Sequence, residues 1–242
     1  MGYKPKVTVV TVCYNAAETI EKTMLSVINQ TYDNVEYLII DGGSKDETLA
    51  IIKKYEDKIS KWISEPDKGI YDAMNKAIKM ATGDWINFMN AGDSFASNDV
   101  LEKIFKIEYT ENVKFLYSDN YYLHPNGAKV LAHHEHTIPS VLHQSAIYRP
   151  SLHREYGFYA VTPKIIISDF LFFCMIPEKY YKKVDTVISV NTVDGVSGSS
   201  LWCGTQRLCA MVVFRKVSFG KMLMKYVKFR MGRAFPFLKK LK

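Results

Sequence analysis

The sequence has few cysteines, and no two of them form a Cys-x-x-Cys pair. They are Cys13, Cys174, Cys203 and Cys209, and the first two lie inside apolar runs of the kind found in protein cores. This spacing indicates neither a zinc site nor a disulfide framework. We therefore expect reduced thiols in a cytosolic compartment.

Long apolar runs are also missing, and a helix that crosses a bilayer needs ~20 apolar residues. The most apolar late stretch, residues 165–176, is interrupted by Ser168 and Asp169, so it is interpreted as core. The chain enters an expected strand at Val7 without an apolar leader, and Lys6 stands where a myristoylation motif has Ser or Thr. These absences predict a cytoplasmic protein that does not span a membrane.

Acidic residues are absent from Arg215 to Lys242, a segment that holds ten of the 32 Lys and Arg residues. The rest of the chain carries 22 basic and 25 acidic residues, so the net charge of +7 belongs to this tail. Helical spacing places Phe219, Met222, Leu223, Tyr226 and Phe229 on one face and Lys221, Lys225 and Lys228 on the other, with Arg230 as an exception.

A basic amphipathic helix of this kind suits the surface of an anionic membrane. The alternative is a terminal helix that docks on its own domain and exposes its basic face to water. Nucleic acid is not an expected partner, because no aromatic stacking platform or reading motif accompanies the basic residues.

What the sequence does contain is a regular alternation of strand and helix patterns, and its 48% hydrophobic residues suffice for one α/β domain with a full core. Ser44 and Glu47 form an expected capping box for the second helix. The expected strands are Val7–Cys13, Val35–Asp41 and Trp85–Met89, and the expected helices are 18–29, a segment ending near Lys58, and 69–81. Such alternation predicts a mostly parallel sheet, in which ligands bind at the carboxyl ends of the strands.

Three aspartates stand at or near such strand ends. Asp41 lies in DGGSKD, Asp67 in SEPDKGIYDAMNKA, and Asp93 in NAGDSF. Taken alone, Asp67 and Asp93 are also typical turn or cap residues. Three neighbouring carboxylates would repel one another, so a divalent cation or a nucleoside with hydrogen-bond donors would explain the grouping.

Several of these pieces together resemble an inverting family 2 glycosyltransferase of the GT-A fold, of the bacterial type that builds surface polysaccharides. The matching segments are VTVVTVCYNAAETIEKTMLSVINQTYDNVEYLIIDGGSKDET, SEPDKGIYDAMNKA, GDWINFMNAGD, LHQSAIYR and ISDFLFF, which cover roughly residues 5–176. The resemblance implies a Rossmann-like, mostly parallel sheet flanked by helices in residues 1–200. Residues 1–95 would form the donor nucleotide half and 96–200 the acceptor half, and 201–242 would be a basic amphipathic helical extension.

The resemblance also implies roles for individual residues. The loop after the first strand would hold the nucleotide base, Asp41 would meet the nucleoside and Asp67 the uracil edge. The loop residues are Thr11, Cys13, Tyr14 and Asn15, and the second nucleotide-binding segment is Asn90, Ala91 and Gly92.

Asp93 would bind a divalent metal between the donor phosphates. Gly92 stands where many relatives have a second Asp, so Asp93 is the only carboxylate of this motif. One carboxylate plus phosphate oxygens and water suits Mn²⁺ or Mg²⁺. Gly92 is alternatively explained by a close approach of the backbone to a phosphate.

Asp169 is the expected general base for the acceptor hydroxyl, because it lies among the apolar residues of IIISDFLFF and relatives have an acidic residue at the head of this helix. In the alternative interpretation, Ser168 or Asp169 caps that helix, and the two roles could also be divided. His143 and Gln144 occupy the His-Gln position of the family and would line the acceptor or diphosphate pocket.

Three other segments have simpler interpretations. The cluster His133–His136 has no known zinc spacing and is expected to be a solvated loop or part of the acceptor-side surface. HPNG at 124–127 predicts a hairpin turn. GVSGSS at 195–200 is either a segment that closes over the donor phosphates or a linker.

Together these features predict a metal-dependent hexosyltransferase. It would move a sugar from a nucleotide-diphospho-sugar, with a UDP-sugar as the expected donor, to a saccharide or lipid-linked saccharide hydroxyl, with inversion, in cell-surface polysaccharide synthesis. It would be peripheral on the inner face of the membrane. The alternative is a non-catalytic nucleotide-sugar-binding or scaffold component of a polysaccharide assembly complex, which the reduced Asp-x-Asp motif would permit.

Overall fold

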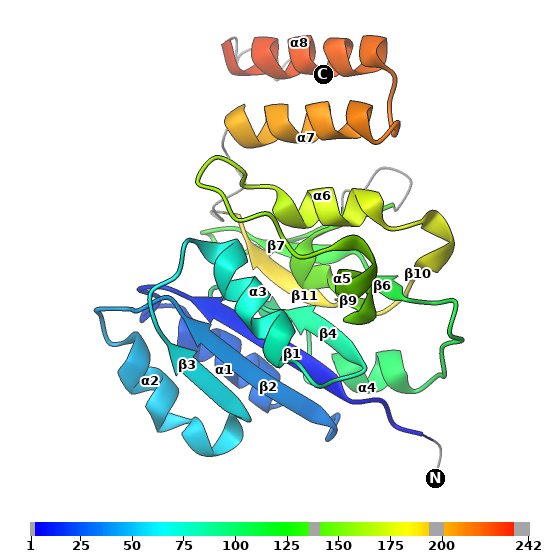
Figure 1. Cartoon of the computed structure of the whole chain (residues 1–242). Helices are drawn as coiled ribbons and strands as arrows, with labels where there is room; N and C mark the ends of the chain where they lie inside the picture. The colour runs from blue at the N-terminus through cyan, green and yellow to red at the C-terminus, as the bar shows by residue number, and fades with distance from the viewer. Residues whose placement is uncertain (1–2, 136–140, 194–200, 235–242) are drawn as a thin grey trace.

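The computed structural model describes residues 3–135, 141–193 and 201–234. In these ranges the main sheet has the strand order β10-β6-β9-β4-β1-β2-β3, and only β9 runs antiparallel to its neighbours (Figure 1). Its strands are β1 (Val7–Cys13), β2 (Val35–Asp41), β3 (Lys61–Ser64), β4 (Trp85–Phe88), β6 (Phe115–Tyr117), β9 (Ala146–Tyr148) and β10 (Tyr181–Lys183). The expected mixed α/β fold with a mostly parallel sheet is confirmed.

Strands β1, β2 and β4 form the centre of the sheet. All seven residues of β1 are buried, as expected for a β-branched run covered by helices on both faces. The bounds expected for β1 and β2 agree with the structure, because continuous apolar runs of this length are distinctive of buried parallel strands.

Helices cover both faces of the main sheet (Figure 1). One apolar core packs under α1 (Ile20–Ile28), α2 (Thr48–Lys54) and α4 (Val100–Phe105). The other packs under α3 (Ile70–Met80), α5 (Ser151–Tyr156) and α6 (Ser168–Met175). Short 3-10 turns lie at η1 (Glu56–Lys58), η2 (His143–Ser145) and η3 (Glu178–Tyr180).

A smaller sheet has the order β5-β11-β7-β8. Its strands are β5 (Ser94–Phe95), β7 (Asn120–Leu123), β8 (Lys129–Ala132) and β11 (Ser189–Thr192). The hairpin turn predicted at 124–127 joins the antiparallel strands β7 and β8, and it is closed by a bond from the Gly127 amide to the His124 carbonyl (2.9 Å). Because β5 follows Asp93 and pairs with β11, this sheet borders the turn after β4.

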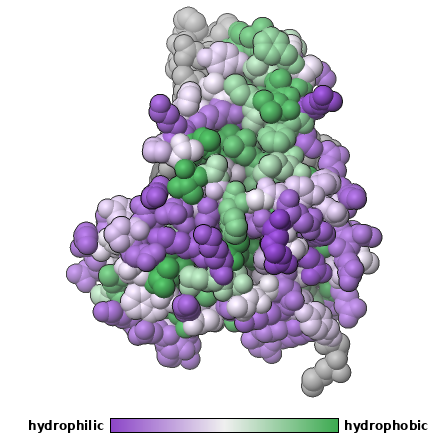
Figure 2. All heavy atoms as spheres, in the orientation of Figure 1, coloured by the Kyte–Doolittle hydropathy of each residue, from purple (hydrophilic) through white to green (hydrophobic). Residues whose placement is uncertain are grey.

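Two helices, α7 (Leu201–Val213) and α8 (Phe219–Ala234), form an outer layer beyond α6 (Figure 1). A third apolar core joins α6 to α7 and includes Phe170, Cys174, Cys203 and Met211. Figure 2 shows apolar side chains gathered over the part of this face where Figure 1 places α6, α7 and α8.

Helix α8 has three kinds of surface rather than the two expected from its sequence. Helix α8 packs against α7, and Met222 and Tyr226 are half-buried, whereas Lys221 and Lys225 are exposed. The third surface is apolar and exposed, and its members are Phe219 (64%), Leu223 (48%), Met224 (61%) and Val227 (45%). Packing against α7 therefore covers only part of the apolar face of α8.

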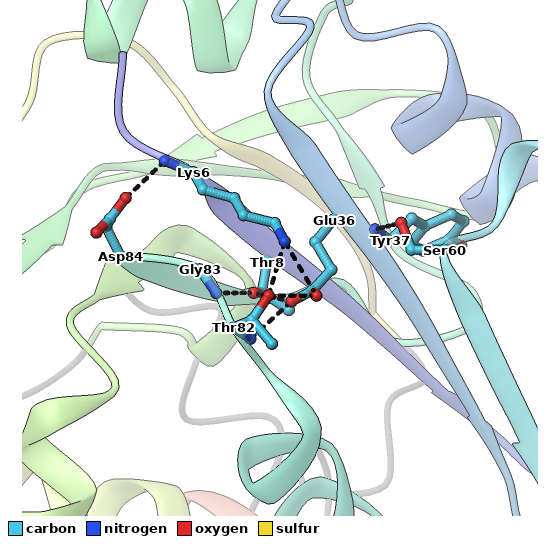
Figure 3. Close-up of polar contacts among 8 residues, drawn as sticks. All are labelled: Lys6, Thr8, Glu36, Tyr37, Ser60, Thr82, Gly83 and Asp84. Atoms are coloured by element: carbon cyan, nitrogen blue, oxygen red, sulfur yellow. Dashed lines mark hydrogen bonds and ion pairs between the residues drawn. The ribbon is translucent and has the colours of Figure 1, made fainter. Parts of the chain in front are cut away.

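At the amino-terminal edge of the main sheet, Glu36 is a buried carboxylate with several donors (Figure 3). It accepts hydrogen bonds from the Thr8 hydroxyl (2.6 Å) and from the amide (2.8 Å) and hydroxyl (2.6 Å) of Thr82, and Lys6 pairs with it at 3.3 Å. The Gly83 amide donates to Thr8, and a Cβ at Gly83 would lie only 2.6 Å from the Thr8 hydroxyl oxygen. This cluster fixes the turn between α3 and β4.

The predicted capping box at Ser44 and Glu47 is wrong. Helix α2 begins at Thr48, and no side chain caps it. The Ser44 hydroxyl instead bonds to Asp41, so the demand of a buried carboxylate overrides the local capping pattern. The second helix also ends at Lys54, four residues before the expected end, and a 3-10 turn follows it.

Of the helices in the described part of the chain, none has both the length and the apolar composition that a membrane crossing requires. The GVSGSS segment at 195–200, interpreted as a closing segment or a linker, lies outside the described residues.

Candidate functional site

The carboxyl ends of β1, β2 and β3 meet at Asp41. In the sheet register, Asp41 lies between Cys13 and Ser64. Its carboxylate is fully buried and accepts bonds from the amides of Gly43 (3.0 Å) and Ser44 (2.9 Å), and from the hydroxyls of Ser44 and Ser64 (2.7 Å to the latter). These donors lower the pKa of Asp41 against the opposing effect of burial. A charged Asp41 thus holds the loop after β2.

The loop after β1 is held by the same segment. The amide of Asn15 donates to the Ser44 hydroxyl (2.7 Å), and the Lys45 amide donates to the Asn15 side chain (2.8 Å). Asn15 has a φ of 47°, a left-handed conformation that asparagine tolerates better than most residues. Tyr14, the residue before it, is 62% exposed and presents its ring to solvent.

Asp67 lies against Gly42 at this edge. A Cβ at Gly42 would be 2.6 Å from Asp67 Oδ2 and 3.4 Å from Tyr14 Cδ2, so Gly42 permits the close approach of both side chains. Asp67 Oδ1 accepts a bond from the Gly69 amide (2.7 Å) at the start of α3. Tyr14, Gly42 and Asp67 therefore form one partly exposed surface at the strand ends.

Two of the expected nucleotide-binding residues lie in the core instead. Thr11 is fully buried and bonds to the Met89 carbonyl and the Tyr37 hydroxyl (2.9 Å each). Cys13 is buried on the same face of β1, because residues two apart on a strand point the same way. A nucleotide cannot reach the Thr11 side chain in this conformation.

The turn after β4 carries Asn90, Ala91, Gly92 and Asp93. The Ala91 amide still pairs with Val12 (3.2 Å), and the Asp93 amide closes a turn on the Asn90 carbonyl (3.0 Å). Gly92 has a φ of 101°, which favours glycine strongly. A Cβ at this position would meet nothing closer than 4.0 Å, so backbone conformation and not crowding accounts for the glycine.

The Asp93 side chain is 9% exposed and lies between η2 and β11. It accepts bonds from the Gln144 side-chain amide (2.7 Å) and the Thr192 backbone amide (3.2 Å), and the Asn191 side chain also bonds to it. Burial nevertheless raises the pKa of Asp93 to about 6. At neutral pH the group is mostly a carboxylate, with a strong preference for a positive partner.

The residues of this turn fit a hard divalent cation to which a diphosphate would also supply oxygen ligands. Asn90 Oδ1 is buried and finds no hydrogen-bond partner among the described residues, and Asp93 supplies a carboxylate three residues later. Carboxylate and amide oxygens are ligands that Mg²⁺ and Mn²⁺ accept. No group of three or more His, Cys, Asp or Glu residues suited to a metal occurs in the described ranges.

Gln144 and His143 separate at η2. Gln144 points to Asp93, as described, whereas His143 is buried and packs against Phe88 with the rings tilted by 33° and their centroids 4.6 Å apart. Burial lowers the pKa of His143 to about 4, so it is neutral at physiological pH. The pocket position expected for Gln144 stays a prediction, and its side chain reaches Asp93. The His143 side chain lies in the core instead of lining a pocket.

His143 begins a chain of buried polar groups. Its Nε2 is hydrogen bonded to the Tyr159 hydroxyl (2.9 Å), which is bonded to the Tyr148 hydroxyl (2.7 Å). Tyr148 is bonded to His153 Nε2 (3.1 Å), and His153 Nδ1 to the Gly157 carbonyl (3.1 Å). Burial also lowers the pKa of His153 to about 4.

Asp169 is half-buried in the first turn of α6, and its Oδ1 accepts a hydrogen bond from the Tyr71 hydroxyl (2.8 Å). Neither Asp169 nor Ser168 caps the helix with its side chain, so the capping alternative is wrong. The Ser168 hydroxyl accepts a bond from the Ala160 amide (2.6 Å) and thereby fixes the preceding loop.

Within the histidine cluster, His133 agrees with the expected solvated loop. Its side chain is exposed and is hydrogen bonded to Asp119 (2.7 Å). His134 is buried, with Nε2 2.5 Å from Asn120 Oδ1. His136 lies outside the described residues.

Sequence reasoning missed the partners of the two candidate carboxylates. Thr192 contacts Asp93 across a separation of 99 residues, and Asn191 is its neighbour in the chain. No local sequence pattern indicates that either residue contacts Asp93. Tyr71 was recognisable only as the residue four positions after Asp67 in SEPDKGIYDAMNKA. Both carboxylates are positioned by contacts that depend on the tertiary fold.

Comparison with known proteins gives these residues a context. The model of the family "Glycosyl transferase family 2" matches residues 8–166. The uncharacterized glycosyltransferase Rv1514c of Mycobacterium tuberculosis is 40% identical over 102 residues, which cover 42% of this chain and 39% of that protein. The Escherichia coli protein WfaP, a UDP-Glc:alpha-D-GlcNAc-diphosphoundecaprenol beta-1,3-glucosyltransferase, is 37% identical over 118 residues, 48% of this chain and 46% of WfaP.

The alignments thus span less than half the length of these curated relatives. Solved structures extend the likeness to nearly the whole chain. TarS of S. aureus in complex with UDP-GlcNAc matches with a TM-score of 0.68 at 18% identity, covering 98% of this chain and 76% of TarS. The mannosyltransferase PcManGT of Pyrobaculum calidifontis, in complex with GDP-Man and Mn²⁺, matches with a TM-score of 0.67 at 17% identity, covering 89% of this chain and 66% of that one. These likenesses show the fold, and the expected GT-A architecture is confirmed.

Proposed function

The chain belongs to glycosyl transferase family 2, and from that membership we propose that it transfers a sugar from a UDP-sugar to a saccharide or lipid-linked saccharide hydroxyl with inversion. WfaP, by its name, uses UDP-Glc and a diphosphoundecaprenol-linked acceptor, and TarS is known in complex with UDP-GlcNAc. These properties belong to the relatives, and they support the same donor and acceptor classes for this chain.

The observation that carries the proposal is the turn Asn90–Asp93. At the carboxyl end of a central strand it combines a buried carboxylate with a buried amide oxygen that has no partner among residues 3–135, 141–193 and 201–234. Such a pair is costly to fold unless something satisfies it in the working state. We assign Asn90 and Asp93 to a Mn²⁺ or Mg²⁺ ion, with Gln144 and Thr192 orienting the Asp93 carboxylate.

The surface of Tyr14, Gly42 and Asp67 is assigned to the nucleoside. The exposed Tyr14 ring can stack on a base, and Asp67 Oδ2 can accept a bond from an imino N–H of uracil. In this assignment Asp41 does not contact the nucleoside directly, because its carboxylate oxygens already accept the hydrogen bonds that hold the loop after β2.

In the reaction, the acceptor hydroxyl must lose a proton as it attacks the anomeric carbon, and the diphosphate leaves from the opposite face. Asp169 is assigned as the base that takes this proton. The bound cation would neutralise the charge that develops on the diphosphate.

Titration calorimetry with UDP tests the donor site. The wild-type protein should bind UDP more tightly with Mn²⁺ than without it, and Asp93→Ala should abolish that enhancement while the protein remains folded. Equal binding with and without Mn²⁺ in the wild type would contradict the assignment of Asp93.

Catalysis is tested separately from binding. Asp169→Asn should bind UDP like the wild type but release UDP from UDP-glucose or UDP-N-acetylglucosamine at least ~100-fold more slowly, the usual contribution of a positioned base. If the wild type binds UDP and neither transfers nor hydrolyses any donor, the non-catalytic scaffold alternative would be favoured.

We also propose that α8 meets an anionic membrane surface, which would make the protein peripheral at the inner face. The apolar surface of α8 defined above stays exposed beside Lys221 and Lys225, and no acidic residue occurs in Leu201–Ala234. An exposed apolar strip next to a basic one is the arrangement that binds lipid headgroups and acyl chains together.

Vesicle sedimentation tests this proposal. The full chain should sediment with phosphatidylglycerol vesicles far more than with phosphatidylcholine vesicles, and the double change Leu223→Ser and Val227→Ser should remove most of the binding. The control pair is Val130→Ser and Leu131→Ser, which removes exposed apolar side chains of β8 instead. Binding that survives the α8 change would contradict the proposal, and binding to DNA that competes with vesicles would indicate a nucleic-acid partner.

A further inference from the structure

We propose that Tyr71 is a positioning residue for Asp169, and that helix α3 uses Tyr71 and Asn75 to hold the acceptor-side base in register with the donor site. The inference rests on the proposed function, because it takes Asp169 as the base. It goes further by assigning a role to helix α3. Asp67 lies just before this helix, and the first two turns of the helix contact α6 and the loop that precedes α6.

The central contact is the hydrogen bond that Tyr71 donates to Asp169 Oδ1 (2.8 Å). The two residues are 98 positions apart, on helices α3 and α6. A hydroxyl that donates to one oxygen of a carboxylate fixes the rotation of the carboxyl group, and it leaves the second oxygen, Oδ2, to receive a proton from a substrate hydroxyl.

The Tyr71 ring is itself held in place. It packs against Tyr159 with ring centroids 5.6 Å apart, and Tyr159 is fixed by its own hydrogen bonds to Tyr148 and His143. Burial and the nearby Asp169 charge raise the pKa of Tyr71, so its hydroxyl keeps its proton and remains a donor at physiological pH. In the hydrogen bond between these two side chains, Tyr71 is therefore always the donor and Asp169 the acceptor.

Asn75, one turn further along α3, makes a second connection to the same region. Its side-chain amide donates to the Tyr159 carbonyl (2.9 Å), and its side-chain oxygen accepts from the Tyr159 amide (3.0 Å). These two hydrogen bonds join the Asn75 side chain to both backbone polar groups of Tyr159. They fix the loop that leads into α6. The Ser168 bond to the Ala160 amide closes that loop on the first turn of α6.

Asp67, Tyr71 and Asn75 follow one another at intervals of four residues. Residues four apart on a helix share one face, so Tyr71 and Asn75 approach the acceptor side together. Asp67 lies just before the helix and bonds to the Gly69 amide at its start. Helix α3 thus connects the proposed uracil contact to the proposed base through two successive turns.

Other titratable groups also feel the charge of Asp169. They come from β9, the loop before α6, η2 and α7, namely Tyr148, Tyr159, His143 and Cys203. Tyr71 donates a hydrogen bond directly to Asp169 Oδ1, so its removal should affect Asp169 directly.

The first test is the change Tyr71→Phe, which keeps the ring and removes the hydroxyl. We expect UDP binding in the presence of Mn²⁺ to stay within about twofold of wild type, whereas kcat for UDP release from UDP-glucose or UDP-N-acetylglucosamine falls ~10-fold or more. An unchanged kcat would overturn the proposal.

The second test separates positioning from general destabilisation. If Tyr71 acts through Asp169, adding Tyr71→Phe to Asp169→Asn should slow UDP release no further, whereas a purely structural role would lower it in both backgrounds. Tyr55→Phe is the matched control, because the Tyr55 hydroxyl donates to the Glu21 carboxylate (2.7 Å) away from the site. It should leave kcat unchanged.

A third measurement does not need turnover. In urea unfolding at pH 7, the midpoint of the double variant Tyr71→Phe with Asp169→Ala should be no lower than that of the less stable of the two single variants, because both changes remove the hydrogen bond between these side chains. Additive losses would contradict the bond itself. If this coupling is present but Asp169→Asn keeps full activity, Asp169 is not the general base, and the proposed function is wrong on that point. The contact between Tyr71 and Asp169 would still be supported.

Discussion

At the residue scale, the two aspartates at neighbouring strand ends have different environments. Asp41 is enclosed by backbone amides and hydroxyls that lower its pKa, whereas burial raises the pKa of Asp93 to about 6. The first carboxylate is satisfied by the protein. The second has neutral donors from Gln144, Asn191 and Thr192, and it lies three residues after Asn90, whose Oδ1 has no partner among the described residues. This difference explains why we assign loop organisation to Asp41 and cation binding to Asp93.

The change Asp41→Asn tests that distinction. An amide group would place N–H donors against the donors of Gly43, Ser44 and Ser64, so the free energy of unfolding should fall by about 2–4 kcal/mol. Urea unfolding at pH 7 measures the loss. Asp33→Asn is the control: its side chain is 80% exposed, and its ion pair with Lys4 should contribute little. A loss below that of the control would contradict the role of Asp41.

At the element scale, the sheet is fixed at both ends of its central strands. The carboxyl ends meet at Asp41, and the amino-terminal edge is closed by the buried Glu36 with Thr8, Thr82 and Lys6 (Figure 3). The hydrogen bonds to Glu36 lower its pKa despite burial. Its stabilising contribution is therefore complete above the unfolded-state pKa of about 4.3 and is lost as the pH falls through the lower folded-state value.

Glu36→Gln should lower the free energy of unfolding by about 1–3 kcal/mol at pH 7, because the amide cannot accept from all four donors. It should also make stability less dependent on pH below 5. Equilibrium urea unfolding at pH 7 and pH 4 provides both quantities. Glu56→Gln serves for comparison, since its bond from Trp62 Nε1 (2.9 Å) is exposed and an amide oxygen can replace it.

The elements that could be predicted from sequence are those whose signal is local. The β-branched runs of β1 and β2 and the HPNG hairpin turn carry their own periodicity or turn chemistry. The start of α2 could not be predicted, because Ser44 serves Asp41 rather than the helix. The side chain of His143 could not be placed either, since a motif fixes sequence position but not which side of a 3-10 turn faces the core.

At the scale of the whole molecule, buried neutral histidines set the response to acid. Burial lowers the pKa of His143 and His153 to about 4, below the value of about 6.5 in an unfolded chain. The unfolded state therefore binds protons first, and stability should fall as the pH drops from about 6.5 to 4. Each histidine contributes a slope of up to about 1.4 kcal/mol per pH unit over that range.

Asp93 opposes this trend, because a raised folded-state pKa adds stability as the pH falls below about 6. Urea unfolding between pH 6.5 and 5 should thus show a steeper loss of stability in Asp93→Asn than in the wild type. Parallel curves for the two proteins would show that Asp93 does not titrate in this range.

The buried polar chain from His143 to Gly157 has a direction. The Gly157 carbonyl can only accept, so neutral His153 carries its proton on Nδ1 and its Nε2 accepts from Tyr148. Tyr148 then accepts from Tyr159, and Tyr159 accepts from His143 Nε2. The two histidines must consequently be opposite tautomers, and a single backbone carbonyl sets the polarity of four successive bonds. Protonating His153 at Nε2 would set its N–H against the Tyr148 O–H. Relief then requires both tyrosine hydroxyls to reverse and His143 to move its proton from Nε2 to Nδ1.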